Sequence, residues 1–330
     1  MRLRGNCIIF NCITCNIVGL AVALLAQSAH ASVLFNDGQS HSVNGTIQND
    51  ILVQNKTTVS VNTKGWIRAV TGSVNILAAR VQDTSKLTVA GGSVTSSTSG
   101  PGNSTGATAS NSSTISLLDG KIQSTTSGPG NSLGVSLANT SKLSISGGYI
   151  SSSTSEGATT TGVRAADSAT ITMTDGQILA TTSPGLAYGV MLFGNSTFEM
   201  SGGQLRPFGA HQSTYGIVAN DNAFVRLTGG NVETLSEYIA GNIDLVFNGS
   251  SRLEIVGRNF NYPSGLIAAR SGTITGILAD NQPFAYVFQR SSSATITLVP
   301  EPSAIILLTV GAVLLASTQL GRAVRRCHNP

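Results

Sequence analysis

Four aspartates have the residue type and spacing that polysaccharide hydrolysis requires. They form two pairs, Asp119 with Asp175 and Asp167 with Asp221, and each pair occupies one position of a repeated sequence, two repeats apart. If the repeats stack like neighbouring strands, ~4.8 Å apart, each pair spans ~9.6 Å, near the upper limit for the carboxyl groups of an inverting glycosidase. Other repeats carry glycine or asparagine at these positions, which is typical of turns. We therefore expect turn-forming aspartates, with catalysis as the alternative.

Other chemically versatile side chains are sparse. His41 and His211 are the only histidines between residues 32 and 299, too few and too far apart for a metal cluster. A Ser/His/Asp triad around His211 has no specific signal, because serine is abundant along the whole chain. We expect His211 to lie in an exposed loop, and we expect neither a metal nor a cofactor.

The aromatic residues indicate packing rather than sugar binding. Trp66, the only tryptophan, follows a glycine near the start of the repeats, and we expect it to pack at the end of the core. The tyrosines are expected to be scattered rather than aligned in a stacking row: Tyr149, Tyr188, Tyr215 and Tyr238.

The cysteines lie near the two ends of the chain. Cys12 and Cys15 have the spacing of a redox or metal pair, but no βαβ pattern surrounds them and no second pair exists. The chain has no cysteine between residues 32 and 299. Disulfides therefore cannot hold the central part together.

Composition favours an all-β secreted protein. Only 10% of residues are charged and 5% are aromatic, whereas glycine occurs 37 times. So few Glu, Lys and Arg residues argue against a compact helical enzyme. Disorder is also disfavoured, because 41% of residues are hydrophobic and the mean hydropathy is +0.18.

The net charge of +4 arises at the ends of the chain. Five of the 19 Lys and Arg residues, and one of the 15 Asp and Glu residues, lie outside residues 32–299. That leaves 14 of each sign and a neutral central part. Without a basic patch, nucleic acid is excluded as a partner.

Residues 1–31 are expected to form a secretory signal peptide with a signal helix. Arg2 and Arg4 supply the positive start, residues 17–26 the apolar segment, and Ala29 and Ala31 the small residues of the cleavage site. An uncleaved membrane anchor is the alternative reading.

Three elements follow one another at the other end, within residues 299–326. Pro300, Glu301 and Pro302 precede the apolar segment 304–316, which is marginal for a membrane-spanning helix. A basic stop then follows, made by Arg322, Arg325 and Arg326. The arginines should stay cytoplasmic, which leaves the central part outside.

This tripartite tail resembles the PEP-CTERM sorting signal of Gram-negative bacteria. The resemblance implies that an exosortase, a membrane enzyme, recognises Pro300, Glu301 and Pro302 and removes the tail after a transient inner-membrane stage. It also implies export to the cell surface or extracellular matrix and association with extracellular polysaccharide. A plain single-pass anchor with a fortuitous Pro-Glu-Pro is the alternative.

The central part is an array of repeats. A turn glycine recurs at intervals of 27 or 28 residues, at Gly65, Gly92, Gly120, Gly148, Gly176, Gly203, Gly230 and Gly257. Six clear copies surround it, each with the alternation of apolar and polar residues that predicts strands. Equivalent apolar positions form columns, of which one contains Leu87, Ile115, Leu143, Ile171, Phe198 and Val225.

We interpret each copy as one coil with three short strands and about five inward side chains. Stacked coils would bury these columns in a narrow core, so the sequence predicts an all-β fold, a right-handed parallel β-helix of about eight coils and roughly 40 Å in length. A flatter solenoid is the alternative, because the repeat length alone does not exclude it. The repeats resemble those of autotransporter passenger domains and adhesin-like surface proteins.

Two further positions predict turns. Glycine pairs or Asp-Gly allow positive φ, and an Asp/Asn column tolerates the left-handed conformation at Asp83, Asn111, Asn139, Asp167 and Asp221. The expected organisation is a signal peptide (1–31), an N-terminal cap (32–57), β-helix repeats (58–260), C-terminal strands or cap (261–298) and the sorting signal (299–326).

These features predict a non-enzymatic, exported surface or matrix protein that presents Ser/Thr/Asn ladders to extracellular polysaccharide. The alternatives are a polysaccharide lyase or hydrolase on the same scaffold, which would need a long insertion and clustered charges, and an adhesin.

Overall fold

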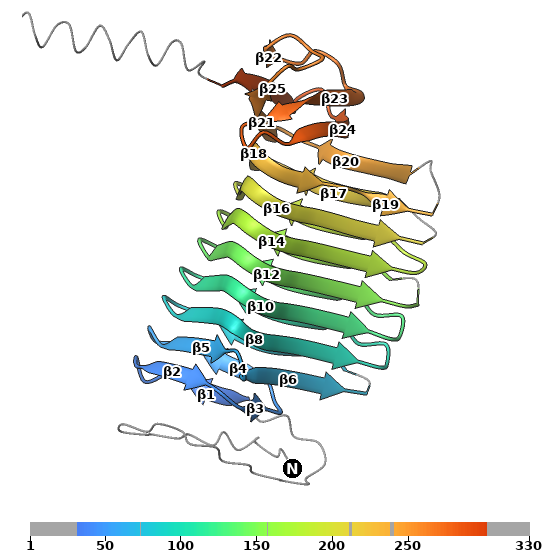
Figure 1. The fold of residues 1–330 in the computed structure, drawn as a ribbon. Coiled ribbons are helices and arrows are strands. Elements are labelled where there is room, and N and C mark those ends of the chain that lie inside the picture. The colour runs from blue at the N-terminus through green and yellow to red at the C-terminus, as the bar shows by residue number, and fades with distance from the viewer. Residues whose placement is uncertain (1–31, 73, 157, 211–212, 238–240, 302–330) are drawn as a thin grey trace, which may run out of the picture.

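Residues 32–301, except residues 73, 157, 211–212 and 238–240, are described by the computed structural model. They form an all-β parallel solenoid of about seven turns, rather than the expected eight, with no helix among the described residues. Figure 1 shows the turns stacked from β1 to β25.

Each regular coil contains one long strand and one short strand. The five long strands are β8 (Lys86–Thr98), β10 (Thr114–Thr126), β12 (Lys142–Thr154), β14 (Thr170–Thr182) and β16 (Thr197–Gly209). The short strands that precede them are β7 (Ile76–Val81), β9 (Ser104–Ala109), β11 (Ser132–Leu137), β13 (Thr160–Ala165) and β15 (Ala187–Leu192). Equivalent strands of successive coils pair in parallel.

The prediction of three short strands per coil was wrong, because the turn glycine bends the long strand without ending it. In β10, Gly120 has a φ of 86°, and the register with β8 shifts between Leu117 and Asp119 and again between Asp119 and Lys121. Such an irregularity bends a strand while pairing resumes on either side. We call the outer surfaces before and after this bend the pre-bend face and the post-bend face, and that of the short strands the short-strand face.

The first strands continue these ladders toward the N-terminus. They are β1 (Val33–Phe35), β2 (Ser40–Val43), β3 (Thr46–Ile47), β4 (Ile51–Val53), β5 (Thr58–Asn62) and β6 (Trp66–Thr71). β1 pairs in parallel with β4, and β2 with β5. The segment for which a cap was predicted, residues 32–57, thus contributes four short strands to the stack.

Toward the C-terminus β17 (Thr214–Ala219) and β18 (Phe224–Val232) still continue the repeat, and the later strands depart from it. These later strands are β19 (Leu235–Ser236), β20 (Asn242–Phe247), β21 (Arg252–Arg258), β22 (Gly265–Leu266), β23 (Ser271–Leu278), β24 (Pro283–Arg290) and β25 (Thr295–Pro300). β23 and β24 form an antiparallel pair, and β25 returns to pair in parallel with β21. Residues 258–301, which we call the C-terminal lobe, cover the end of the stack (Figure 1).

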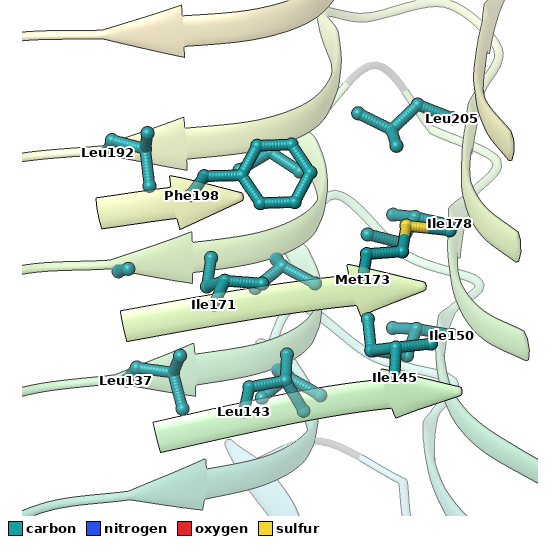
Figure 2. Packing of buried hydrophobic residues seen from close by; sticks show 14 of the residues in the cluster. Leu137, Leu143, Ile145, Ile150, Ile171, Met173, Ile178, Leu192, Phe198 and Leu205 are labelled. Atoms are coloured by element: carbon teal, nitrogen blue, oxygen red, sulfur yellow. The ribbon is translucent and has the colours of Figure 1, made fainter. Parts of the chain in front are cut away.

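Apolar ladders fill the interior. Leu143, Ile171 and Phe198 stand opposite one another on β12, β14 and β16 and are at most 1% exposed. Figure 2 shows this ladder beside that of Ile150 and Ile178. At ~1.5–3 kcal/mol for each buried aliphatic side chain, a single coil gains little net stability, so stability accumulates through stacking.

Part of the interior is polar. Serine hydroxyls of the long strands meet those of the following short strands, Ser96 with Ser104 and Ser124 with Ser132, each pair at an oxygen–oxygen distance of 2.7 Å. All four residues are buried. The Ser/Thr ladders were expected on the surface, but serine and threonine side chains that alternate with the outward ones along each strand line the core instead.

The predicted Asp/Asn turn is confirmed. Asp83, Asn111, Asn139, Asp167 and Asp221 all have φ between 58° and 61°. Their side chains also connect coils, since Asn139 Nδ2 donates to Asn111 Oδ1 at 3.0 Å and Asn111 Nδ2 donates to Asp83 Oδ1 at 3.3 Å.

The signal helix and the transmembrane helix predicted for the two ends lie outside the described residues. Within residues 32–301, apart from the gaps given above, there is no helix with the length and hydrophobicity needed to cross a membrane.

Candidate functional site

The candidate catalytic aspartates are engaged in local backbone contacts. Asp119 and Asp175 lie at the bend, where each Oδ1 accepts a 2.7 Å hydrogen bond from the N–H of the next residue, a glycine. Asp167 Oδ2 accepts from the Asn139 N–H at 2.8 Å, and Asp221 Oδ2 from the Gly194 N–H at 2.9 Å. These bonds support the turn role expected for all four.

His41 lies at the first coils and contacts Asp37 at 2.8 Å between Nε2 and Oδ1. This hydrogen bond is the main cause that lowers the pKa of the Asp37 carboxyl. His211 lies outside the described residues. Among the residues that are described, no three His, Cys, Asp or Glu side chains come together as metal ligands would.

Trp66 does not pack at the end of the core, as expected, but lies on the post-bend face with 36% of its surface exposed. The indole Nε1 donates a 2.8 Å hydrogen bond to Thr95 Oγ1 of the next coil. The Arg68 guanidinium lies 5.2 Å from the centre of the ring. Ile67, the next residue, points inward instead, because neighbouring side chains of a strand alternate between its two faces.

The strand register places Trp66 in a column with residues of the following coils. Trp66 stands opposite Ser93, Ser93 opposite Lys121, and Lys121 opposite Tyr149. Each of these residues directly follows a turn glycine of the repeat. Aligning the repeats could therefore have revealed this column, which sequence reasoning missed.

Two neighbouring columns of the post-bend face consist mostly of small polar side chains. The first contains Arg68, Thr95, Gln123, Ser151 and Leu179, and the second contains Val70, Ser97, Thr125, Ser153 and Thr181. Strands repeat every ~4.8 Å, and alternate residues of one strand are ~6.7 Å apart. The three columns form a regular grid of hydrogen-bonding groups, with an aromatic ring at Trp66 and another at Tyr149.

The short-strand face carries a second aromatic feature. Tyr188 on β15 and Tyr215 on β17 stack with ring centroids 5.1 Å apart and an interplanar angle of 12°. Burial is the main cause that raises the pKa of the Tyr188 hydroxyl, and the neighbouring Tyr215 raises it further. The prediction that the tyrosines are scattered was wrong for this pair, whereas Tyr238 lies outside the described residues.

The predicted sorting motif begins at the last strand. Pro300 ends β25 opposite Gly257, and the Glu301 carboxylate accepts bonds of 3.2 and 3.0 Å from Arg258 Nη1. Arg258 Nη2 also donates to Asn281 Oδ1 at 2.5 Å. The remaining predicted processing residues lie outside the described residues: Ala29, Ala31, Pro302, Arg322, Arg325 and Arg326.

Comparison with known proteins identifies no relative: no family model, curated protein or solved structure matches this chain.

Proposed function

We propose that the chain is an exported, non-enzymatic protein of the bacterial surface or extracellular matrix, a right-handed β-helical rod that associates with extracellular polysaccharide. The observation that supports this most is the grid of outward hydroxyl and amide groups on the post-bend face, which repeats with every coil. A right-handed sense agrees with the strong preference of parallel strand connections for that hand.

Neutral sugar polymers present rows of hydroxyl groups that can donate and accept hydrogen bonds. Each bond to an exposed serine or threonine contributes little, ~0.5–1.5 kcal/mol at most, because water competes for the same groups. A rod that repeats these groups at fixed spacing makes many such bonds to one polymer, and multivalency raises the overall affinity without any deep pocket.

Sorting is the second part of the proposal. An N-terminal signal peptide would direct export, and an exosortase would act on Pro300, Glu301 and Pro302 while the apolar segment holds the chain transiently in the inner membrane. The motif begins at Pro300, the last residue of β25, so processing after the motif would release the whole solenoid.

A mass spectrum of the protein recovered separately from cells and from culture matrix tests the sorting. We expect loss of residues 1–31 and of the residues after about Pro302 in the matrix fraction. An intact C-terminus in every fraction would contradict sorting and leave a tethered rod.

Incubation with a panel of polysaccharides tests the binding part. We expect retention of the protein by at least one polymer without release of new reducing ends. Release of reducing ends would instead indicate a lyase or hydrolase, and retention by none would contradict the proposed association.

A further inference from the structure

We infer that the post-bend face of β6 to β14 is a binding site for an acidic polysaccharide, which lies along the rod with sugar rings against Trp66 and Tyr149 and carboxylates near Arg68 and Lys121. The inference rests on the proposed association with polysaccharide and adds the site, its residues and the chemical class of the polymer.

Two exposed aromatic side chains mark the ends of this site. Trp66 and Tyr149 are each 36% exposed and stand in one column, three coils apart, which corresponds to ~14 Å. The bond from the indole to Thr95 and the nearby Arg68 hold the Trp66 ring in place. A ring that is already fixed loses little conformational entropy when a ligand packs on it.

The charge on this face has one sign. Arg68 and Lys121 point outward, and within the described strands no outward residue of the post-bend face from β6 to β14 is an aspartate or glutamate. Among the carboxylates beside this face, Asp119 and Asp175 lie at the bend and bind backbone N–H groups, and Glu156 lies in the loop two residues after the end of β12.

Later coils show the contrasting arrangement. On the same face Arg206 Nε lies 3.1 Å from Glu233 Oε2, so that cation has its own partner within the protein. Arg68 and Lys121 form no ion pair with any described carboxylate. Charge complementarity therefore favours a polymer that brings its own carboxylates to the early coils.

The flat grid between the aromatic rings fits a polymer better than a small molecule. Thr95, Gln123, Thr125 and Ser151 supply hydroxyl and amide groups at each successive strand. Because the columns run along the rod, a chain aligned with them meets a new outward side chain at every ~4.8 Å step, and most of these side chains are polar.

Affinity electrophoresis of the full chain in mild detergent tests the inference, with polygalacturonate as the acidic probe and dextran as the neutral one. We expect stronger retardation by polygalacturonate, weakening as salt is raised, because salt screens exposed charges. The double variant W66S/Y149S should bind polygalacturonate about tenfold more weakly at any salt concentration. The variant R68Q/K121Q should bind about fivefold to tenfold more weakly at low salt and like wild type at high salt.

Two matched variants serve as controls. R80Q/K142Q removes two cations from the short-strand and pre-bend faces, and Y188S removes an aromatic ring from the short-strand face. Both should bind as wild type does, and circular dichroism should show the same β content for all variants.

The outcomes separate the two proposals. Equal or stronger retardation by dextran would overturn the acidic class and leave the association with polysaccharide standing. Loss of binding in the controls rather than in W66S/Y149S would place the site on another face. Retardation by neither polymer would overturn the site.

Discussion

Arg290 holds the C-terminal lobe together through its guanidinium, and replacing it tests how the rod is closed. Its Nη1 and Nη2 atoms donate to the carbonyl oxygens of Ala294 at 2.6 Å, Ala268 at 2.8 Å, Ile267 at 3.0 Å and Ser291 at 3.2 Å. Its Nε donates to a fifth carbonyl, that of Ala269, at 2.9 Å. We predict that Arg290→Met loosens this lobe and leaves the regular coils unchanged.

The magnitude follows from which carbonyls lose their donor. Ile267 and Ala294 are buried, whereas the other three acceptors belong to residues that water can reach. Each buried carbonyl left without a partner costs ~1–3 kcal/mol, and methionine keeps the apolar stem, so we expect a loss of about 4 kcal/mol in the free energy of local unfolding. That corresponds to roughly a thousandfold faster hydrogen exchange in the lobe.

Hydrogen exchange followed by mass spectrometry measures this difference segment by segment. Amides of β22, β23 and β25 should lose protection, while those of β10 and β12 should keep it, because each coil of a solenoid contacts only its neighbours. Arg270→Met, at an exposed side chain of the same lobe, is the control and should exchange like wild type. Unchanged protection in Arg290→Met, or an equal loss in the control, would refute the reasoning.

Three further predictions concern the core, a turn and a buried acid. Ile171→Ala should lower the free energy of unfolding by ~2–5 kcal/mol in urea titration, because it leaves a cavity in a fully buried ladder, whereas the outward Thr172→Ala should change it little. Asn139→Ala should lower the melting temperature, since alanine at a φ of 60° is strained by ~1–2 kcal/mol, and Asn139→Gly should lower it less. Burial raises the pKa of the Asp244 carboxyl above its ordinary value of 3.8, so the folded state favours the protonated form. The protonated carboxyl therefore supports folding at low pH, and this support is lost as the pH rises through the raised pKa. Titration of stability against pH should therefore show wild type losing stability relative to Asp244→Asn over that range; a constant difference would contradict it.

The sequence predicted the coil and its turns well because both rest on local chemistry. Columns such as Leu143, Ile171 and Phe198 follow directly from the repeat spacing, and the register of β12, β14 and β16 confirms them. The Asp/Asn column was found because few residue types tolerate positive φ.

The bend and the outer aromatic residues were harder to predict, for one shared physical reason. The turn at Gly65 separates β5 from β6 and resets the alternation of inward and outward side chains, so the sequence of β5 does not determine the direction of Trp66. Tyr188 and Tyr215 lie 27 residues apart, which is one repeat, and this spacing is the signal in the sequence that predicts their stacking.

In the C-terminal lobe the sequence predicted strands but not how they pair. After Gly257 the repeat is lost, and the antiparallel pairing of β23 with β24 depends on a turn at Asn281, where φ is 69°. The inward columns of earlier coils do reach Ile296 and Phe288, which stand opposite Leu253 and Leu245, but the spacing there is 43 residues rather than 27 or 28. Their arrangement is therefore set by tertiary contacts, such as those of Arg290, rather than by periodicity.

The pairing of β25 with β21 makes the end of the rod sensitive to the order in which the chain arrives. In a chain translocated N-terminus first, each coil can fold on the coil before it, but β21 keeps an open edge until residues 295–300 have emerged. A chain arrested before that point exposes an unpaired strand, which invites aggregation and proteolysis. If the chain is exported as proposed, its fold is complete only after β25 has crossed, and β25 ends at Pro300, the first residue of the proposed sorting motif.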